Sequence, residues 1–255
     1  MELPVNRFKA GLASGRCQIG LWTSLPGTVP IEILSHCGFD WLVLDTEHAP
    51  GDPLTILPQL QTMAAFDTAP VVRAAWNDSV LIKRFLDLGA QTLLLPYVQT
   101  RAEAEAAVTA MRYAPRGERG MAGSVRAAGY GQIADYVHRA EEELCLIVQV
   151  ETREALDNLE DIASVDGVHG VFIGPADLSA SLGHPGDQFH PEVVAAIEGA
   201  ITRLVKLGVP AGILTFRDDF VRRCIELGAA FVAVGMDSGL MARAARELSD
   251  RYRQD

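Results

Sequence analysis

Residues 144–174 read LCLIVQVE–TREALDNLEDIASVD–GVHGVFIG, with breaks after residues 151 and 166. An apolar run of strand length comes first, a segment that opens like a helix follows, and a second apolar run closes the unit. Continuous apolar strands that alternate with helices are typical of a parallel sheet covered on both faces. This unit therefore predicts a strand, a helix and a second strand parallel to the first.

The same alternation continues on both sides of this unit and gives eight candidate strands. They are Gln18–Leu25, Asp40–His48, Pro70–Trp76, Gln91–Val98, Leu144–Glu151, Gly167–Gly174, Pro210–Phe216 and Ala230–Asp237. Several predicted helices end at a glycine, which takes the left-handed conformation of a helix end without a Cβ clash. Eight such units predict an α/β fold with a single domain over residues 1–255, a (β/α)₈ TIM barrel.

Composition and charge restrict the partners of the protein. Apolar residues make up 49% of the chain, and 33 acidic against 22 basic residues give a net charge of −11. This acidic balance argues against nucleic acid or an anionic membrane as a partner. The four cysteines are scattered without a C-x-x-C pair, which predicts free thiols in a reducing cytosol. Residues 1–11 show no signal peptide, and no apolar run is long enough to cross a bilayer, so we expect a cytoplasmic protein.

Polar residues gather where the predicted strands end, which is where barrels of this type carry their active sites. Gln149 and Glu151 are two residues apart, so they share one face of a strand. Asp177 follows the next strand. Two carboxylates from neighbouring strands suit Mg²⁺ or Mn²⁺. Alternatively, Glu151 caps the helix that begins near Thr152; this pair alone leaves both roles open, and the other polar strand ends favour the metal.

A cation and a histidine accompany these acids. Arg73 is the one basic residue at a predicted strand end, and a guanidinium there suits a substrate carboxylate. An ion pair of Arg73 with Glu47 or Asp45 is the alternative. His48 is a candidate acid/base group. Asp87 lies near a helix C-terminus, where an acid is unfavourable, so we expect it to have a partner, and a His48–Asp87 pair is one possibility.

The lysines exclude one mechanism. The chain has only three, Lys9, Lys83 and Lys206, and none of them ends a predicted strand. An aldolase that forms a Schiff base needs a buried amine at the barrel mouth. A covalent imine mechanism is therefore not expected, and a metal ion has to accept the developing charge.

Several motifs in order along the chain resemble one family. They are Asp45–Pro50 (DTEHAP), Val71–Arg73 (VVR), Leu94–Tyr97 (LLPY), Pro115–Gly120 (PRGERG), Gln149–Thr152 (QVET) and Phe172–Ser179 (FIGPADLS). Together they resemble the 4-hydroxy-2-oxoheptanedioate aldolase/citrate lyase family. The chain is most similar to its class II pyruvate aldolases, which include 2-dehydro-3-deoxyglucarate aldolase.

The resemblance implies a role for each matching residue. The metal ligands fall on Glu151 and Asp177, for Mg²⁺, Mn²⁺ or Co²⁺. The carboxylate-binding arginine falls on Arg73, and the histidine oriented by an aspartate falls on His48 with Asp87. Gln149 lies near the metal, and the backbone of Gly174, Pro175 and Ala176 up to Asp177 helps to hold the pyruvate carboxylate. Trp22 and Leu214, at other strand ends, complete the expected substrate-binding set.

The resemblance also implies an assembly. Similar proteins form hexamers, as trimers of dimers, and exchange a C-terminal helix, which here is Gly239–Tyr252. The pattern of that segment is equally consistent with an ordinary eighth helix. The loop Tyr113–Gln132, with Arg116, Arg119 and Arg126, is a candidate lid or subunit contact.

The predicted function is reversible aldol cleavage of 4-hydroxy-2-oxoacids to an aldehyde and pyruvate or hydroxypyruvate. Three alternatives remain at this point. One is a CoA-thioester lyase of the citrate lyase β or malyl-CoA type. Another is a barrel that binds phosphate at Gly235–Gly239, although Asp237 within that turn argues against an anion. The last is a non-catalytic binding barrel, which predicts polar residues that do not converge at one mouth.

Overall fold

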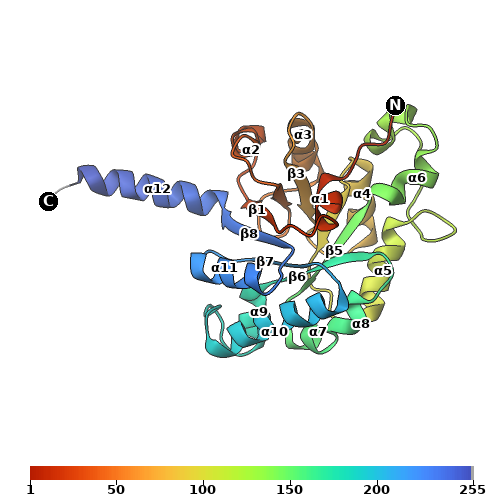
Figure 1. Cartoon of the computed structure of the whole chain (residues 1–255). Coiled ribbons are helices and arrows are strands. Elements are labelled where there is room, and N and C mark those ends of the chain that lie inside the picture. The colour runs from red at the N-terminus through yellow and green to blue at the C-terminus, as the bar shows by residue number, and fades with distance from the viewer. Residues whose placement is uncertain (254–255) are drawn as a thin grey trace.

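The computed structural model of the protein describes residues 1–253. Eight parallel strands close into a barrel in chain order, so the predicted (β/α)₈ fold is confirmed (Figure 1). The strands are β1 (Gln18–Thr23), β2 (Trp41–Asp45), β3 (Ala69–Arg73), β4 (Thr92–Leu95), β5 (Cys145–Val150), β6 (Val168–Ile173), β7 (Ala211–Leu214) and β8 (Phe231–Met236). Each overlaps its predicted run, and each ends one to three residues earlier, because the last predicted residues leave the sheet.

The helices surround the barrel. They are α1 (Arg7–Leu12), α2 (Thr28–Ser35), α3 (Pro53–Met63), α4 (Ser79–Asp87), α5 (Arg101–Met111), α6 (Tyr136–Glu143), α7 (Arg153–Asp157), α8 (Leu159–Ala163), α9 (Pro175–Ser181), α10 (Pro191–Leu207), α11 (Asp218–Glu226) and α12 (Asp237–Tyr252). Within residues 1–253, no helix combines the length and the apolar character that a bilayer crossing requires.

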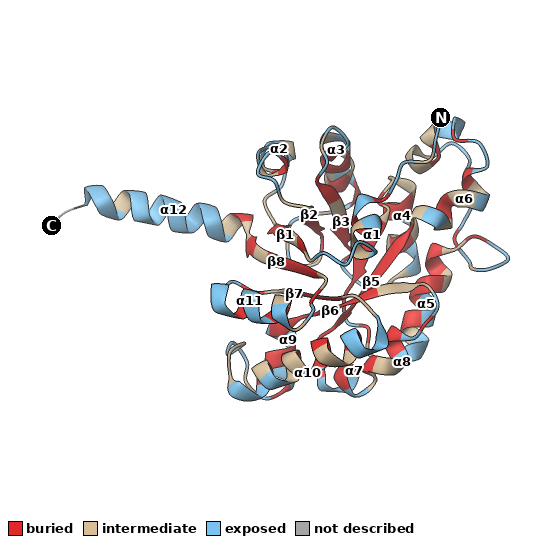
Figure 2. Cartoon of the chain, in the orientation of Figure 1, coloured by how far each residue is buried: buried red, intermediate tan, exposed pale blue. Residues whose placement is uncertain are grey.

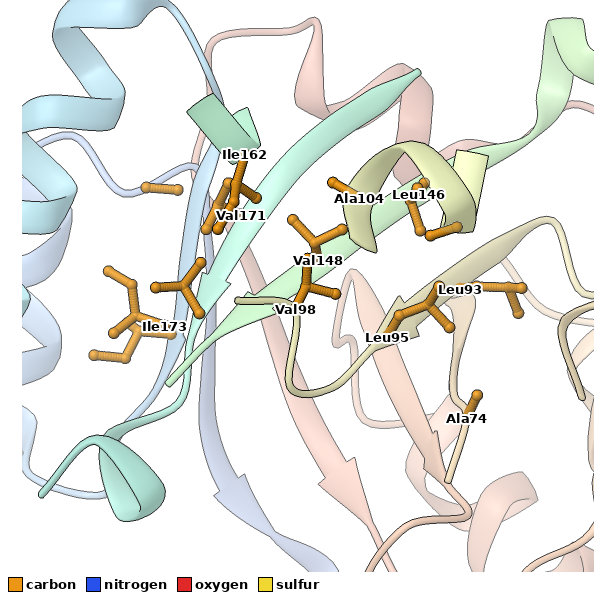
Figure 3. Packing of buried hydrophobic residues seen from close by; sticks show 14 of the residues in the cluster. Ala74, Leu93, Leu95, Val98, Ala104, Leu146, Val148, Ile162, Val171 and Ile173 are labelled. Carbon is orange, nitrogen blue, oxygen red and sulfur yellow. The ribbon is translucent and has the colours of Figure 1, made fainter. Parts of the chain in front are cut away.

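The strands bury both of their faces. Outward side chains pack against the helices, as Figure 3 shows for Val148 and Val171 beside Ile162 of α8. Alternate side chains point inward and form a second core within the barrel, rich in aromatic rings. Phe8 of α1 packs its ring against Trp41 and Phe231 at centroid distances of 5.5 and 5.4 Å. The barrel interior is therefore filled with apolar side chains, and the charged side chains Asp45, Arg73 and Glu151 lie at its mouth.

The helix α12 extends away from the barrel (Figures 1 and 2). Its only buried residue is Asp237, at the beginning of the helix. Its large apolar side chains, Leu240, Met241, Leu248 and Tyr252, are exposed. The alternative of an ordinary eighth helix packed along its own barrel is therefore wrong, because these apolar side chains are exposed in the single chain.

The loop Tyr113–Gln132 lies at the end of the barrel opposite the mouth. It follows α5, which runs back from the mouth, and Arg126 Nη1 donates to Leu88 O at 2.7 Å in the turn that precedes β4. The lid function expected for this loop is therefore wrong for the chain's own mouth. A subunit contact stays a prediction.

Candidate active site

Arg73 and Asp45 form the buried centre of the mouth. The two residues are register partners at the ends of β3 and β2. The guanidinium donates from Nε to Asp45 Oδ1 at 2.8 Å and from Nη2 to Asp45 Oδ2 at 2.6 Å. Burial alone would raise the pKa of Asp45, but the hydrogen bonds and charge of Arg73 outweigh it and hold that pKa below its usual value. The ion pair considered as an alternative for Arg73 is thus present in the structure.

Trp22 supports this pair from β1. Its indole Nε1 donates to Asp45 Oδ2 at 3.2 Å, and its ring lies 4.7 Å from the Arg73 guanidinium carbon. A cation over an aromatic face is attracted by the electron density of the ring. Trp22 therefore fixes the orientation of Arg73 in addition to lining the mouth.

Glu47 is a site residue that the sequence analysis did not select. Its Oε2 lies 2.6 Å from Arg73 Nη1, yet this buried oxygen accepts no hydrogen bond, so the contact is purely ionic. Burial raises the pKa of Glu47; Arg73 and His48 oppose this, while Asp45 and Asp177 add to it. Glu47 therefore interacts electrostatically both with the Arg73–Asp45 pair and with Asp177. The signal in the sequence was its position between Asp45 and His48, at the end of a strand.

Glu151 is an almost fully buried carboxylate, with a relative exposure of 1%. The Tyr97 amide donates to its Oε1 at 2.8 Å, and Gln149 Nε2 donates to its Oε2. Burial, together with the smaller effects of the negative charges of Asp177 and Glu47, nevertheless raises the pKa of Glu151 to about 7. The charged neighbours that act on this carboxylate are thus acidic. A bound cation would offset their repulsion and stabilise the ionised form of Glu151.

The helix-cap alternative for Glu151 is wrong. Thr152 is the N-cap of α7, and its hydroxyl accepts from the Ala155 amide at 3.1 Å. Glu151 instead points toward β6, where Gly174 leaves room for it: a Cβ on Gly174 would lie 2.4 Å from Glu151 Oε2. A glycine at position 174 is therefore needed to leave space for the Glu151 carboxylate.

Asp177 lies in the first turn of α9, directly after β6. Its side chain is exposed, and its charge reaches both Glu151 and Glu47. The backbone amides of the same segment differ from the expectation. The Gly174 amide donates to Val150 O at 3.1 Å, and Pro175 has no N–H, so within residues 174–177 only the amides of Ala176 and Asp177 are available to an anion.

Two further oxygens at the mouth lack partners. Gln149 Oε1 and Thr215 Oγ1 are buried and make no hydrogen bond within the described chain. Leu214, half-buried at the end of β7, precedes Thr215. Carboxylate and amide oxygens are ligands that suit Mg²⁺ and Mn²⁺. The buried carboxylate of Glu151, the charge of Asp177 and the unpartnered Gln149 oxygen therefore fit a divalent cation.

His48 and Asp87 do not meet within one copy of the chain. The His48 side chain is 67% exposed, and its Nε2 lies 3.8 Å from Glu47 Oε1. Asp87 is the last residue of α4, at the far end of the barrel, where its Oδ1 accepts from the buried Arg119 at 2.8 Å. The expected pair is wrong within a protomer because α4 runs back from the mouth. Asp87 does have a partner, as its position predicted, but the partner is Arg119.

Two aromatic side chains border the mouth beside Glu151. Tyr97 has a left-handed backbone with φ of 58°, and its ring stacks on Trp76 with centroids 5.7 Å apart. This conformation is uncommon for a bulky residue, and it coincides with the amide that holds Glu151. Nothing in the sequence pattern indicated the unusual backbone.

The phosphate alternative at Gly235–Gly239 is not supported. The carboxylate of Asp237 itself occupies the start of α12, where it accepts from the amides of Ser24 and Leu25 at 2.9 and 3.0 Å. The non-catalytic alternative is also disfavoured. Arg73, Glu151 and Asp177 lie at the same end of the barrel. Glu47 contacts Arg73, and the charges of Glu47 and Asp177 both act on Glu151.

Comparison with known proteins gives consistent results. A profile of the HpcH/HpaI aldolase/citrate lyase family matches residues 18–244. A pyruvate aldolase of Rhizobium etli is 60% identical over 252 residues, covering 99% of this chain and 99% of the relative. A hydroxypyruvate/pyruvate aldolase of Sagittula stellata is 54% identical over 245 residues, covering 96% and 97%. A 4-hydroxy-2-oxo-heptane-1,7-dioate aldolase of Klebsiella pneumoniae is 52% identical over 248 residues, covering 97% and 94%.

A solved structure agrees with these sequence matches. The crystal structure of an HpcH/HpaI aldolase/citrate lyase family protein from Burkholderia cenocepacia superimposes with a TM-score of 0.94 at 38% identity. The match covers 98% of this chain and 100% of the other. The resemblance drawn from the motifs is confirmed over nearly the whole length.

Proposed function

The chain belongs to the HpcH/HpaI aldolase/citrate lyase family, and on that basis we propose that it cleaves 4-hydroxy-2-oxoacids to an aldehyde and pyruvate or hydroxypyruvate with a divalent cation. It is an aldolase, and hence a carbon–carbon lyase. One observation carries the metal dependence. Glu151 is a buried carboxylate whose pKa rises to about 7 through burial, next to the acidic Asp177 and Glu47.

Glu151 and Asp177 are the proposed ligands of the cation, with Gln149 Oε1 beside them. Mg²⁺, Mn²⁺ and Co²⁺ all accept such an oxygen set. When bound, the ion supplies a Lewis acid for the negative charge that develops on the keto oxygen as the C3–C4 bond breaks. Gln149 and the Tyr97 amide orient Glu151 by their hydrogen bonds to its two oxygens.

Arg73 is the proposed contact for the substrate carboxylate. Asp45 occupies its Nε and Nη2, and Glu47 lies against its Nη1 without a hydrogen bond. A substrate carboxylate gains most at Nη1, where it replaces an ionic contact with a charge-assisted hydrogen bond. The free amides of Ala176 and Asp177 approach the same substrate from β6, and Trp22 and Leu214 line the remaining wall.

His48 is the proposed group that moves the proton of the C4 hydroxyl. Its exposed imidazole reaches the solvent side of the mouth, where the aldehyde half of the substrate enters. Asp87 lies at the other end of the same barrel, so orientation of His48 by Asp87 requires a second copy of the chain. This requirement agrees with an assembly in which mouths and far ends of neighbouring barrels meet.

The proposed assembly is a hexamer, a trimer of dimers, in which α12 packs on a neighbouring barrel. It is supported by the exposure of Leu240, Met241, Leu248 and Tyr252 on a helix that leaves its own barrel. The proposed location is the cytoplasm, and the proposed substrates are small molecules, with neither nucleic acid nor membrane as partner.

A metal-supplemented assay tests the function. Metal-free protein, pyruvate or hydroxypyruvate and a panel of aldehydes are incubated with and without Mg²⁺, Mn²⁺ or Co²⁺, and aldol products are measured. We expect product only with metal, and none from the Glu151→Gln variant. Full activity after exhaustive chelation would contradict the metal role, and activity on CoA esters alone would favour the thioester lyase.

A further inference from the structure

A second group of metal-binding side chains lies outside the mouth, around the loop that joins α9 to α10. His184 belongs to this loop, His190 is the N-cap of α10, and Glu192 lies in the first turn of α10. One ligand atom of each residue lies within 4.8 Å of the other two. We propose that His184, His190 and Glu192 form a binding site for a zinc-like transition-metal ion, separate from the site at the mouth.

The three side chains are already in contact. His184 Nε2 lies 3.0 Å from Glu192 Oε2, and the rings of His184 and His190 stack with centroids 3.4 Å apart. Two imidazole nitrogens and one carboxylate oxygen are the ligands that catalytic zinc sites use, with water in the fourth position. The cluster therefore has the donor number and the donor types of an open transition-metal site.

The surrounding chain holds these ligands in place. The Asp187 amide donates to His184 O at 3.0 Å, and the His190 amide donates to Asp187 O at 3.2 Å, so the loop folds both histidines to one side. Arg153 Nη2 lies 3.1 Å from Glu192 Oε1. This contact leaves Oε2 free for the ion and fixes the carboxylate, as groups behind metal ligands commonly do.

Metal binding requires a defined exchange of contacts. The ion takes the place of the proton on His184 Nε2; in the neutral ring this proton moves to Nδ1, so the imidazole stays neutral and Glu192 Oε2 turns from this contact to the ion. His190 Nδ1 accepts from the Glu192 amide at 3.3 Å; ligation through Nε2 places a proton on Nδ1 and ends this long contact. The ring planes, 16° from parallel, also have to turn, because an imidazole lone pair lies in its ring plane. Both histidines are only half-buried, so they have room to turn.

The donor set predicts which ions bind. Imidazole nitrogens favour Zn²⁺, Co²⁺, Ni²⁺ and Cu²⁺, whereas Mg²⁺ and Ca²⁺ require oxygen ligands. The proposed site at the mouth consists of oxygens alone. The two proposed sites therefore differ in preference: Mg²⁺ suits only the mouth, whereas Zn²⁺ suits the histidine cluster even when Mg²⁺ occupies the mouth.

Calorimetric titration with Zn²⁺ tests the proposal. The Glu151→Gln variant removes the proposed site at the mouth, and the parent protein in excess Mg²⁺ provides a second background. In both we expect one Zn²⁺ per chain. His184→Ala or His190→Ala should weaken this binding by more than about tenfold, while circular dichroism remains unchanged.

A matched control uses another histidine outside the cluster. His36 packs on Phe66, with centroids 4.7 Å apart, and His36→Ala should leave Zn²⁺ binding unchanged. Absence of Zn²⁺ binding in both backgrounds would overturn the proposal. Zn²⁺ binding that survives both His184→Ala and His190→Ala would overturn it as well.

Discussion

Two carboxylates at the mouth show how surroundings decide the role of a residue. Asp45 and Glu151 are both buried at strand ends. Arg73 holds the pKa of Asp45 low, whereas burial and the smaller effects of acidic neighbours raise the pKa of Glu151 to about 7. Asp45 is therefore paired with a cation of its own chain, and no cation within the described residues forms an ion pair with Glu151. This contrast is the physical basis for assigning the metal to Glu151.

Substitution of Arg73 should destabilise the metal-free protein. Arg73→Ala leaves Asp45 buried without its cation, and removal of one partner of a buried ion pair costs about 3–5 kcal/mol. Arg73→Lys keeps the charge but cannot hold both oxygens of Asp45, so we expect an intermediate loss. Urea unfolding of the three proteins measures the difference in free energy. Equal stability of all three would show that the pair contributes nothing.

His169 should make stability depend on pH. Burial, with a smaller effect from the charge of Lys9, lowers the pKa of His169 from 6.5 to about 4. The folded chain thus keeps this ring neutral, and the unfolded chain protonates it more readily. Its contribution is complete above pH 6.5 and is lost as the pH falls toward 4. It is of the order of 1–3 kcal/mol.

The variant His169→Asn isolates this effect. In the parent protein, the Leu146 amide donates a hydrogen bond to His169 Nδ1 at 3.2 Å. The side-chain oxygen of asparagine can accept the same hydrogen bond. Between pH 6.5 and 4, the free energy of unfolding of the variant should fall less steeply than that of the parent. The same slope in both proteins would remove His169 as the cause.

At the scale of elements, most of the barrel could be predicted from the sequence. Each strand is a continuous apolar run, because both of its faces are buried. The strand ends were less certain, since Thr46 to His48 continue the run in sequence but leave the sheet in space. The proposed ligands Glu151 and Asp177 could be selected because they follow adjacent strands.

Other elements could not be predicted for definite physical reasons. The direction of α12 depends on which surface covers its apolar side chains. The sequence of α12 is the same whether that surface belongs to its own barrel or to a neighbouring one. The partner of Asp87 depends on α4 running back from the mouth and on the buried Arg119. The amide of Tyr97 reaches Glu151 through a left-handed backbone, which the type of residue does not indicate.

Removal of α12 should alter assembly and leave the barrel intact. A chain that ends at Gly239 keeps Asp237 and its hydrogen bonds to Ser24 and Leu25. We expect the circular dichroism of a folded barrel and a smaller assembly by light scattering, because α12 beyond its first turn extends away from its own barrel. An unchanged assembly mass would contradict the proposed exchange.

At the scale of the whole molecule, the barrel separates two kinds of surface. The mouth lies where β2, β3, β5 and β6 bring their last residues together. The far end carries Asp87, Arg119 and the loop Tyr113–Gln132, remote from the mouth of the same chain. The proposed orientation of His48 by Asp87 therefore requires a second copy of the chain.

The most direct measurement is Mn²⁺ binding to the metal-free protein, followed by the paramagnetic resonance signal of the free ion. Addition of pyruvate should tighten binding, because the oxoacid adds oxygen ligands to the same ion. We predict that Glu151→Gln and Asp177→Asn each weaken Mn²⁺ binding by more than about tenfold and abolish the effect of pyruvate. Mn²⁺ binding that is equally tight in the parent and in both variants would contradict a metal held by these two carboxylates.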